Sequence, residues 1–214
     1  MNPRRSAMSR RRSRIATPCA ALAAIATLPA HAHHAMDYQL PATALEGLLS
    51  GLGHPIIGVD HLLFIVGAGV LAARLERGYL LTLVFVLASM LAASARAMGA
   101  PWQMSELWIA GSLVVLGLIA ITMREPSRML VATLFAVSGL AHGYALAAAI
   151  VGAEATPLYA YFTGLTFIQC AIALAAWRAA RLLAARRPAF PVQRLTGVAV
   201  GVAGIVFAGM IALG

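Results

Sequence analysis

The chain has 214 residues, of which 61% are hydrophobic and only 11% are charged, and its mean hydropathy of +0.85 excludes an ordinary soluble domain. Its net charge of +9 comes from arginine alone, and six of the arginines lie in the first fourteen residues. Because no basic cluster marks a nucleic-acid-binding face, we expect the lipid bilayer, and no nucleic acid, as a partner.

Residues 1–32 have the three regions of a cleavable secretory signal peptide. The basic stretch MNPRRSAMSRRRSR precedes the apolar stretch IATPCAALAAIATLP, and Ala30-His31-Ala32 forms a small-residue cleavage site. We expect cleavage after Ala32, which leaves His33 as the new N-terminus outside the cytoplasm. An uncleaved signal anchor is the alternative.

Residues 33–56 are expected to form a periplasmic N-terminal segment, in which PATALEGLLSGLG (41–53) is a short helix at the membrane interface or dipping into it. Residues 57–214 contain stretches of about twenty residues with almost no charge, the length that crosses ~30 Å of hydrocarbon as a helix. These runs do not alternate as barrel strands do. We therefore predict an all-α, polytopic membrane helix bundle, with about six transmembrane helices at 57–73, 79–98, 105–123, 128–151, 158–177 and 196–213.

Arginines mark alternate connections between these spans. Cytoplasmic loops of membrane proteins collect arginine, and here the arginines follow the first, third and fifth spans: Arg74, Arg77, Arg124, Arg128, Arg178, Arg181, Arg186, Arg187 and Arg194. The opposite connections hold only Arg96. We expect a multi-pass protein of the bacterial inner membrane, with both ends of the mature chain in the periplasm.

The stretch HPIIGVDHLLF places His54, Asp60 and His61 where the first apolar run begins. An ionisable group in hydrocarbon usually faces a partner, a cavity or a transport path, and imidazole with carboxylate suits divalent nickel, cobalt, zinc or copper. On a straight helix the two histidines would stand ~10.5 Å apart along the axis, too far for one ion. Gly53, Pro55 and Gly58 permit a bend that would bring them together.

His142 falls in the same outer half of the bundle, since it lies fourteen residues after Arg128, or about 21 Å of helix rise. We therefore expect a metal site of His54, Asp60, His61 and His142, with His142 lining the next position inward. The structural alternative is that His54 merely precedes the helix, with Pro55 in its first turn, while Asp60 hydrogen-bonds a neighbouring span.

HPIIGVDHLLF resembles the His-x5-Asp-His signature of the HupE/UreJ family, and the resemblance extends from HHAMDYQLP at residue 33 to about Trp177. The family comprises polytopic inner-membrane proteins regarded as nickel or cobalt permeases, often associated with hydrogenase or urease maturation. The resemblance implies a metal role for His54, Asp60 and His61.

The family's second motif, Phe-His-Gly-x-Ala-His-Gly followed by Glu, is partly present as VSGLAHGYALAAAI. His142 is kept, Ser138 stands at the position of the first histidine, and no glutamate follows before Glu154. The resemblance also points to Gln169, where some relatives have histidine, and to Glu106. Glu106 has a structural reading as well, because a carboxylate is favoured at a helix N-terminus.

A free amine beside the His33 ring would form a chelating pair, so His33, His34 and Asp37 are further candidate metal ligands that could capture a cation in the periplasm. The alternative is a disordered terminus.

The leading interpretation is a secondary permease for a divalent transition metal, with nickel or cobalt favoured over copper or zinc, and no enzymatic activity. One alternative is an accessory or sensor protein that binds metal without transport, and another is a haem-bearing electron-transfer protein with His61 and His142 as axial ligands. Partners would be the metal ion, a second copy of the chain, or metalloenzyme-maturation proteins. Trp102, Trp108, Tyr159 and Tyr161 are expected to be interface anchors.

Overall fold

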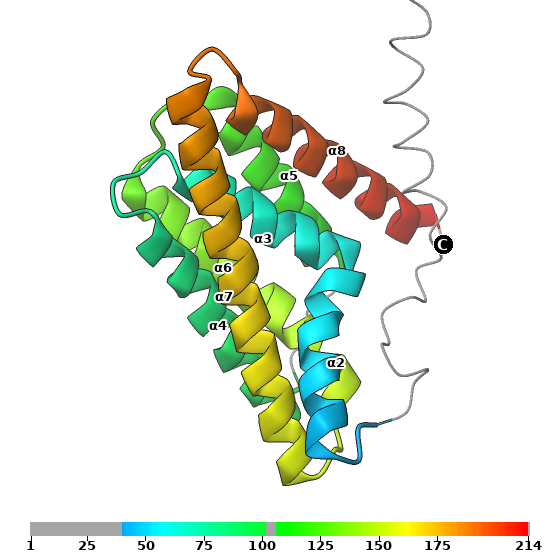
Figure 1. Ribbon diagram of the computed structural model, residues 1–214. Coiled ribbons are helices and arrows are strands. Elements are labelled where there is room, and N and C mark those ends of the chain that lie inside the picture. The colour runs from blue at the N-terminus through cyan, green and yellow to red at the C-terminus, as the bar shows by residue number, and fades with distance from the viewer. Residues whose placement is uncertain (1–39, 102–105, 214) are drawn as a thin grey trace, which may run out of the picture. The chain divides into compact units, whose positions relative to one another are not determined.

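A computed structural model describes residues 40–101 and 106–213, which belong to a unit that begins at His33 (Figure 1). The predicted signal peptide lies outside the described residues. The helices are α2 (Ala44–Ile57), α3 (Val59–Ala72), α4 (Tyr79–Ala97), α5 (Glu106–Thr122), α6 (Arg128–Leu146), the 3-10 turn η1 (Ala147–Ile150), α7 (Ala155–Arg186) and α8 (Val192–Leu213). The described ranges contain no strand, which confirms the all-α prediction.

Four helical segments of the described chain are long and apolar enough to cross a membrane: α4, α6 with η1, α7 and α8. The pair α2 and α3 adds a fifth if it counts as one broken span, because its two halves meet at a bend of 76°. The helix α5 is apolar but has 17 residues, just under the usual length. The multi-pass helical fold therefore holds, while the predicted count of six is approximate.

The predicted first span, 57–73, corresponds to a helix that is too short to cross the membrane by itself. Its helix α3 has 14 residues, which rise only ~21 Å. The segment begins earlier, in α2, and both halves contact α7: α2 lies beside it and α3 crosses it (Figure 1). Gly47 contacts Pro157 near the start of α7, and Gly69 lies against Ala173 and Trp177 twenty residues further on. The short helix expected at 41–53 is thus one half of a bent pair, which is either a broken span or a re-entrant loop.

Helix α2 starts at a well-formed cap. Thr43 Oγ1 accepts a hydrogen bond from the Glu46 amide at 3.2 Å, while Glu46 Oε2 accepts from the Thr43 and Ala42 amides at 3.2 and 2.8 Å. This reciprocal arrangement satisfies amides that a helix N-terminus leaves without partners. The cap therefore fixes where the bent pair begins.

Neighbouring helices run in the directions expected of alternating passes. Helices α4 and α6 are parallel, since Gly139 lies against Phe85 and Ala88 while Arg96 bonds the Tyr144 carbonyl at 3.0 Å. Helices α5 and α8 are antiparallel (Figure 1), since Gly197 approaches Ala120 while Gly204 approaches Ala110, as the small-residue face of α8 allows.

The arginines that follow α3 and α5 bind the ends of neighbouring helices. Arg74 donates hydrogen bonds to the carbonyls of Ala120, at 3.0 Å, and Met123, and so caps the C-terminus of α5. Arg128 donates to the Glu76 carbonyl at 2.8 Å. Partial burial and, secondarily, the nearby charge of Arg194 lower the pKa of Arg74 below its ordinary value. These contacts join the α3–α4 connection to the α5–α6 connection, both of which the sequence predicts to be cytoplasmic.

Candidate metal centre

The break between α2 and α3 places two histidines at one point. Pro55 lies in the last turn of α2, where it cannot donate a backbone hydrogen bond. Gly58 then takes an extended conformation, with its amide bonded to the His54 carbonyl at 2.9 Å. A Cβ at Gly58 would lie 2.7 Å from His61 Cδ2, so only glycine leaves room for that ring. The His54 and His61 rings are consequently 6.2 Å apart, centroid to centroid.

His142 joins this pair from α6. His61 Nδ1 and His142 Nδ1 form a hydrogen bond of 2.8 Å, and their ring centroids are 4.9 Å apart. All three histidines are buried, with exposed fractions of 4% for His54, 3% for His61 and 0% for His142. His142 therefore contacts His61 directly and does not line a separate position further inward. We call His54, His61 and His142 the histidine cluster.

Two hydroxyl groups hold the outer ends of the cluster. Tyr161 on α7 lies 2.9 Å from His54 Nδ1, and its own hydroxyl donates to the Leu146 carbonyl at 2.6 Å. Ser112 on α5 lies 3.0 Å from His142 Nε2 and donates to the Ile109 carbonyl at 2.7 Å. Since both hydroxyl protons are committed to carbonyls, each oxygen must accept a hydrogen bond from its histidine.

For neutral imidazole rings, these bonds determine which nitrogen carries the proton. His54 carries its proton on Nδ1, and His142 carries its proton on Nε2. His142 Nδ1 is then an acceptor, so His61 must donate from its own Nδ1. His54 and His61 each have their lone pair on Nε2. This is the arrangement in which a metal-binding histidine is oriented by a partner on its other nitrogen.

Asp60 stands beside the cluster in the first turn of α3. Its Oδ1 accepts a hydrogen bond from the His61 amide at 2.9 Å, and its side chain is half-buried. A carboxylate at this position is favoured by the helix dipole. Asp60 therefore contacts the backbone of its own helix at this point.

The remaining predicted residues lie elsewhere. Glu106 is exposed at the first residue of α5, and Ser138 is buried one turn before His142. Gln169 is buried on α7, where it bonds Ser89 on α4. The candidates His33, His34 and Asp37 lie outside the described residues.

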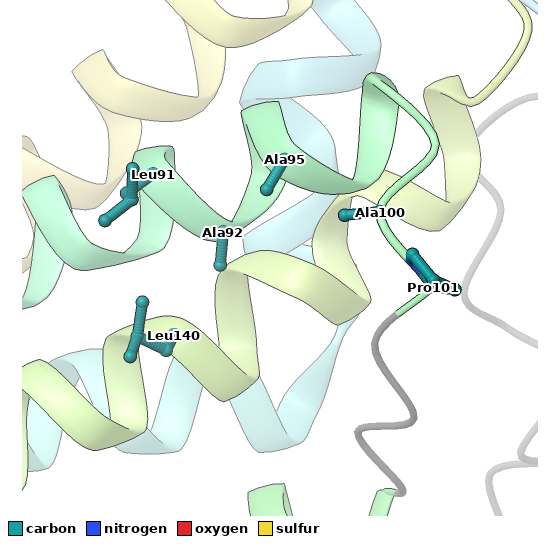
Figure 2. A pocket seen from close by; sticks show the side chains of 6 residues that line it. All are labelled: Leu91, Ala92, Ala95, Ala100, Pro101 and Leu140. Atoms are coloured by element: carbon teal, nitrogen blue, oxygen red, sulfur yellow. The ribbon is translucent and has the colours of Figure 1, made fainter.

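Two surface pockets of the described chain are mostly apolar. Figure 2 shows one of about 490 Å³ between α4, α6 and the residues after α4, lined by Leu91, Ala92, Ala95, Ala100, Pro101 and Leu140. A second, of about 600 Å³, lies between α5 and α6 and includes Ser112 and Ser138 in its wall. Since Ser112 bonds His142, the second pocket comes within one hydrogen bond of the histidine cluster.

The chain matches the family model described as HupE / UreJ protein over residues 20–207. The chain belongs to the HupE/UreJ family. No curated protein and no solved structure matches it. As a member of the HupE/UreJ family with several apolar helices, it is a multi-pass, metal-related membrane protein.

In this HupE/UreJ protein the residues 40–101 and 106–213 contain no group of three or more His, Cys, Asp or Glu side chains arranged to hold a metal ion. Two of the three clustered rings bond each other, which explains why the cluster is not a closed cage. A structural metal centre would have four protein ligands, and the described residues contain no such set.

Sequence reasoning missed the two hydroxyl partners. Tyr161, one of the expected interface anchors, is fully buried and bonds His54. Trp108 and Tyr159 are exposed, and Trp102 lies outside the described residues. Nothing in the sequence around Ser112 indicated a role at the site, except that it is a polar residue in an apolar span. Such residues usually bond across helices, and that rule points to Ser112 without naming its partner.

Proposed function

We propose that this chain is a secondary permease for a divalent transition-metal ion, with nickel or cobalt favoured and copper or zinc as further ions that its ligands suit. The observation that carries the proposal is the histidine cluster: three buried imidazoles from three helices meet at a helix break, where His61 bonds His142 and the His54 ring lies 6.2 Å from the His61 ring. Buried polar groups of this kind in a membrane protein mark binding sites and transport paths.

In this proposal His54 and His61 bind the ion through Nε2, and Asp60 supplies negative charge beside them. His142 acts through His61, because it accepts the His61 Nδ1 proton and so keeps the lone pair on Nε2. Two imidazoles are ligands that a first-row ion accepts, and they do not enclose it. Such a site releases its ion more readily than a four-ligand cage does.

The histidine-rich segment before α2 would receive the ion first, through His33, His34 and Asp37. Glu106 at the start of α5 and Ser138 beside the cluster are further candidate ligands. The sequence contains no ATP-binding loop, so we expect movement to follow a gradient or a partner. A second copy of the chain and metalloenzyme-maturation proteins are the partners that fit a permease of this family.

Ser138, at the position of the first histidine of the second motif, favours a second candidate, an accessory or sensor protein that binds metal without moving it. Flux separates the two, since only a permease carries ions into sealed vesicles. The haem interpretation has less support. His61 and His142 bond each other at 2.8 Å, which leaves no room for a macrocycle between the two rings.

The test is uptake of Ni²⁺ or Co²⁺ into proteoliposomes that contain the purified protein. The parent should accumulate the ion, and His61→Ala should reduce the initial rate by about a hundredfold, as expected when a central imidazole ligand is removed. Thr163→Ala is the control, because Thr163 is exposed and bonds only within α7 among the contacts observed. Uptake by correctly inserted His61→Ala at the parental rate would refute the proposal, and binding without flux would select the accessory role.

A further inference from the structure

Gln169 and Ser89 form a polar pair inside the bundle that the histidine cluster does not use. Both side chains are fully buried, Gln169 on α7 and Ser89 on α4. Gln169 Nε2 donates to Ser89 Oγ at 3.2 Å, while Gln169 Oε1 has no hydrogen-bond partner within the described part of the chain. If the Gln169 amide were rotated by 180°, Nε2 in place of Oε1 would lack a hydrogen-bond partner, because Ser89 Oγ bonds only one of the two amide atoms.

The pair is costly as a packing feature. A buried acceptor without a partner loses its hydration and gains nothing in return, and an apolar side chain of similar size would avoid that loss. Next to Gln169 lie residues of the apolar core, such as Ala173 and Cys170. Because the amide weakens the fold at this point, a role in binding explains its presence better than a role in packing.

The pair lies on the inner side of the histidine cluster. Gln169 follows Tyr161, the residue that bonds His54, by eight residues along α7, or about 12 Å of rise toward the arginine-rich end. Ser89 lies against Gly143, the neighbour of His142, since a Cβ at Gly143 would meet the Ser89 carbonyl. The pair therefore begins at the level of His142 and continues inward.

We propose that Gln169 Oε1 and Ser89 Oγ form a second, weaker site for the same divalent cation, occupied after the ion leaves His54 and His61. This inference rests on the proposed function. Amide and hydroxyl oxygens are neutral ligands that first-row ions bind more weakly than imidazole, and conduction requires sites from which the ion can leave. Two oxygens fill only part of the coordination sphere, so the ion keeps water at this site.

The decisive variant is Gln169→Met, which keeps the volume and removes the oxygen. We expect the rate of Ni²⁺ uptake into proteoliposomes to fall about tenfold, the lower range seen when one supporting ligand is lost. The Kd for Ni²⁺ in detergent, measured by calorimetry, should stay within about twofold of the parent, because the histidine cluster is intact. The melting temperature should be equal or higher, since the buried orphan acceptor is gone.

Ser89→Ala is the second variant and should also slow uptake with unchanged Ni²⁺ affinity. Thr166→Ala is the matched control one turn earlier on α7, where the hydroxyl bonds only the Phe162 carbonyl of its own helix among the observed contacts, and it should transport like the parent. Parental uptake by both Gln169→Met and Ser89→Ala overturns the second site but leaves the permease proposal standing. A lower melting temperature together with weaker Ni²⁺ binding in Gln169→Met marks a structural role and also overturns it. A parent that neither binds nor transports Ni²⁺ removes both proposals.

Discussion

At the scale of single residues, the geometry of the histidine cluster depends on hydrogen bonds to backbone carbonyls that lie outside it. Tyr161 is fixed by the Leu146 carbonyl and Ser112 by the Ile109 carbonyl. Each hydroxyl therefore acts only as an acceptor toward its histidine, and the proton position on every ring follows. The cluster is thus oriented by its partners before any ion arrives, which reduces the cost of ordering the ligands on binding.

This orientation predicts the effect of Tyr161→Phe. The variant removes the acceptor of the His54 Nδ1 proton, so His54 is no longer held with its lone pair on Nε2. Loss of such an orienting partner typically weakens metal binding by about tenfold or more, which calorimetry with Ni²⁺ would measure. Tyr159→Phe is the matched control, because Tyr159 is 70% exposed on the same helix. Equal Ni²⁺ affinities for the two variants would contradict the assigned role.

The sequence predicts the ligand types but not their partners. Gly53, Pro55 and Gly58 around His54 permitted a bend in the predicted helix, and a single site for His54 and His61 depended on that bend. Tyr161 and Ser112 lie on other helices, and nothing local to HPIIGVDHLLF specifies which residue of α5 or α7 will face it. The direct contact of His142 with His61 depends in the same way on the packing of α6 against α3.

At the scale of helices, the bent pair α2–α3 depends on close approach to α7. Gly47 and Gly51 lie directly on the α7 backbone, at Pro157 and Tyr161. On α7, a Cβ added to Gly164 would lie 2.5 Å from the Leu48 carbonyl oxygen. Small residues on both helices let the backbones meet, as is common inside membranes. The sequence predicted a helix here but not its packing against α7, because the contact between α2 and α7 joins residues more than a hundred positions apart.

Gly51→Ala should therefore separate the two helices. Its Cβ would collide with the Tyr161 carbonyl, and overpacking of this kind costs about 1–3 kcal/mol. We expect a lower melting temperature in detergent and weaker Ni²⁺ binding, since Tyr161 moves away from His54. Gly209→Ala on α8 provides the comparison, because nothing lies within 4 Å of its added Cβ. If Gly51→Ala melts and binds like Gly209→Ala, the close packing of α2 on α7 does not hold the site.

At the scale of the whole molecule, the arginine distribution and the helix directions lead to the same arrangement of the connections. Parallel α4 and α6 both start beside arginine-bearing connections, and α7 ends in one. With 32 residues, α7 is long enough to carry Arg178, Arg181 and Arg186 beyond the hydrocarbon. The number of passes was harder to predict, because length alone cannot distinguish a short span such as α5, or a broken one, from a full crossing.

This orientation can be tested with two single-cysteine variants in a background where Cys19 and Cys170 are both replaced by alanine. Glu154 and Glu125 are exposed residues on opposite sides of the predicted membrane. Glu154→Cys should react with a membrane-impermeant maleimide in intact spheroplasts, whereas Glu125→Cys should react only after permeabilisation, because cytoplasmic loops carry the arginine. The reverse pattern would invert the topology and place the histidine cluster nearer the cytoplasm.

The pairing of α2 with α7 also determines when the binding centre can exist during biosynthesis. Helix α2 leaves the ribosome about a hundred residues before the start of α7, which at usual elongation rates is a delay of roughly 5–20 seconds. Until then His54 lacks its hydrogen-bond partner Tyr161, and Gly47 and Gly51 of α2 lack the α7 backbone against which they pack. The histidine cluster therefore assembles late in synthesis, when α2, an early segment, packs against α7, a late one.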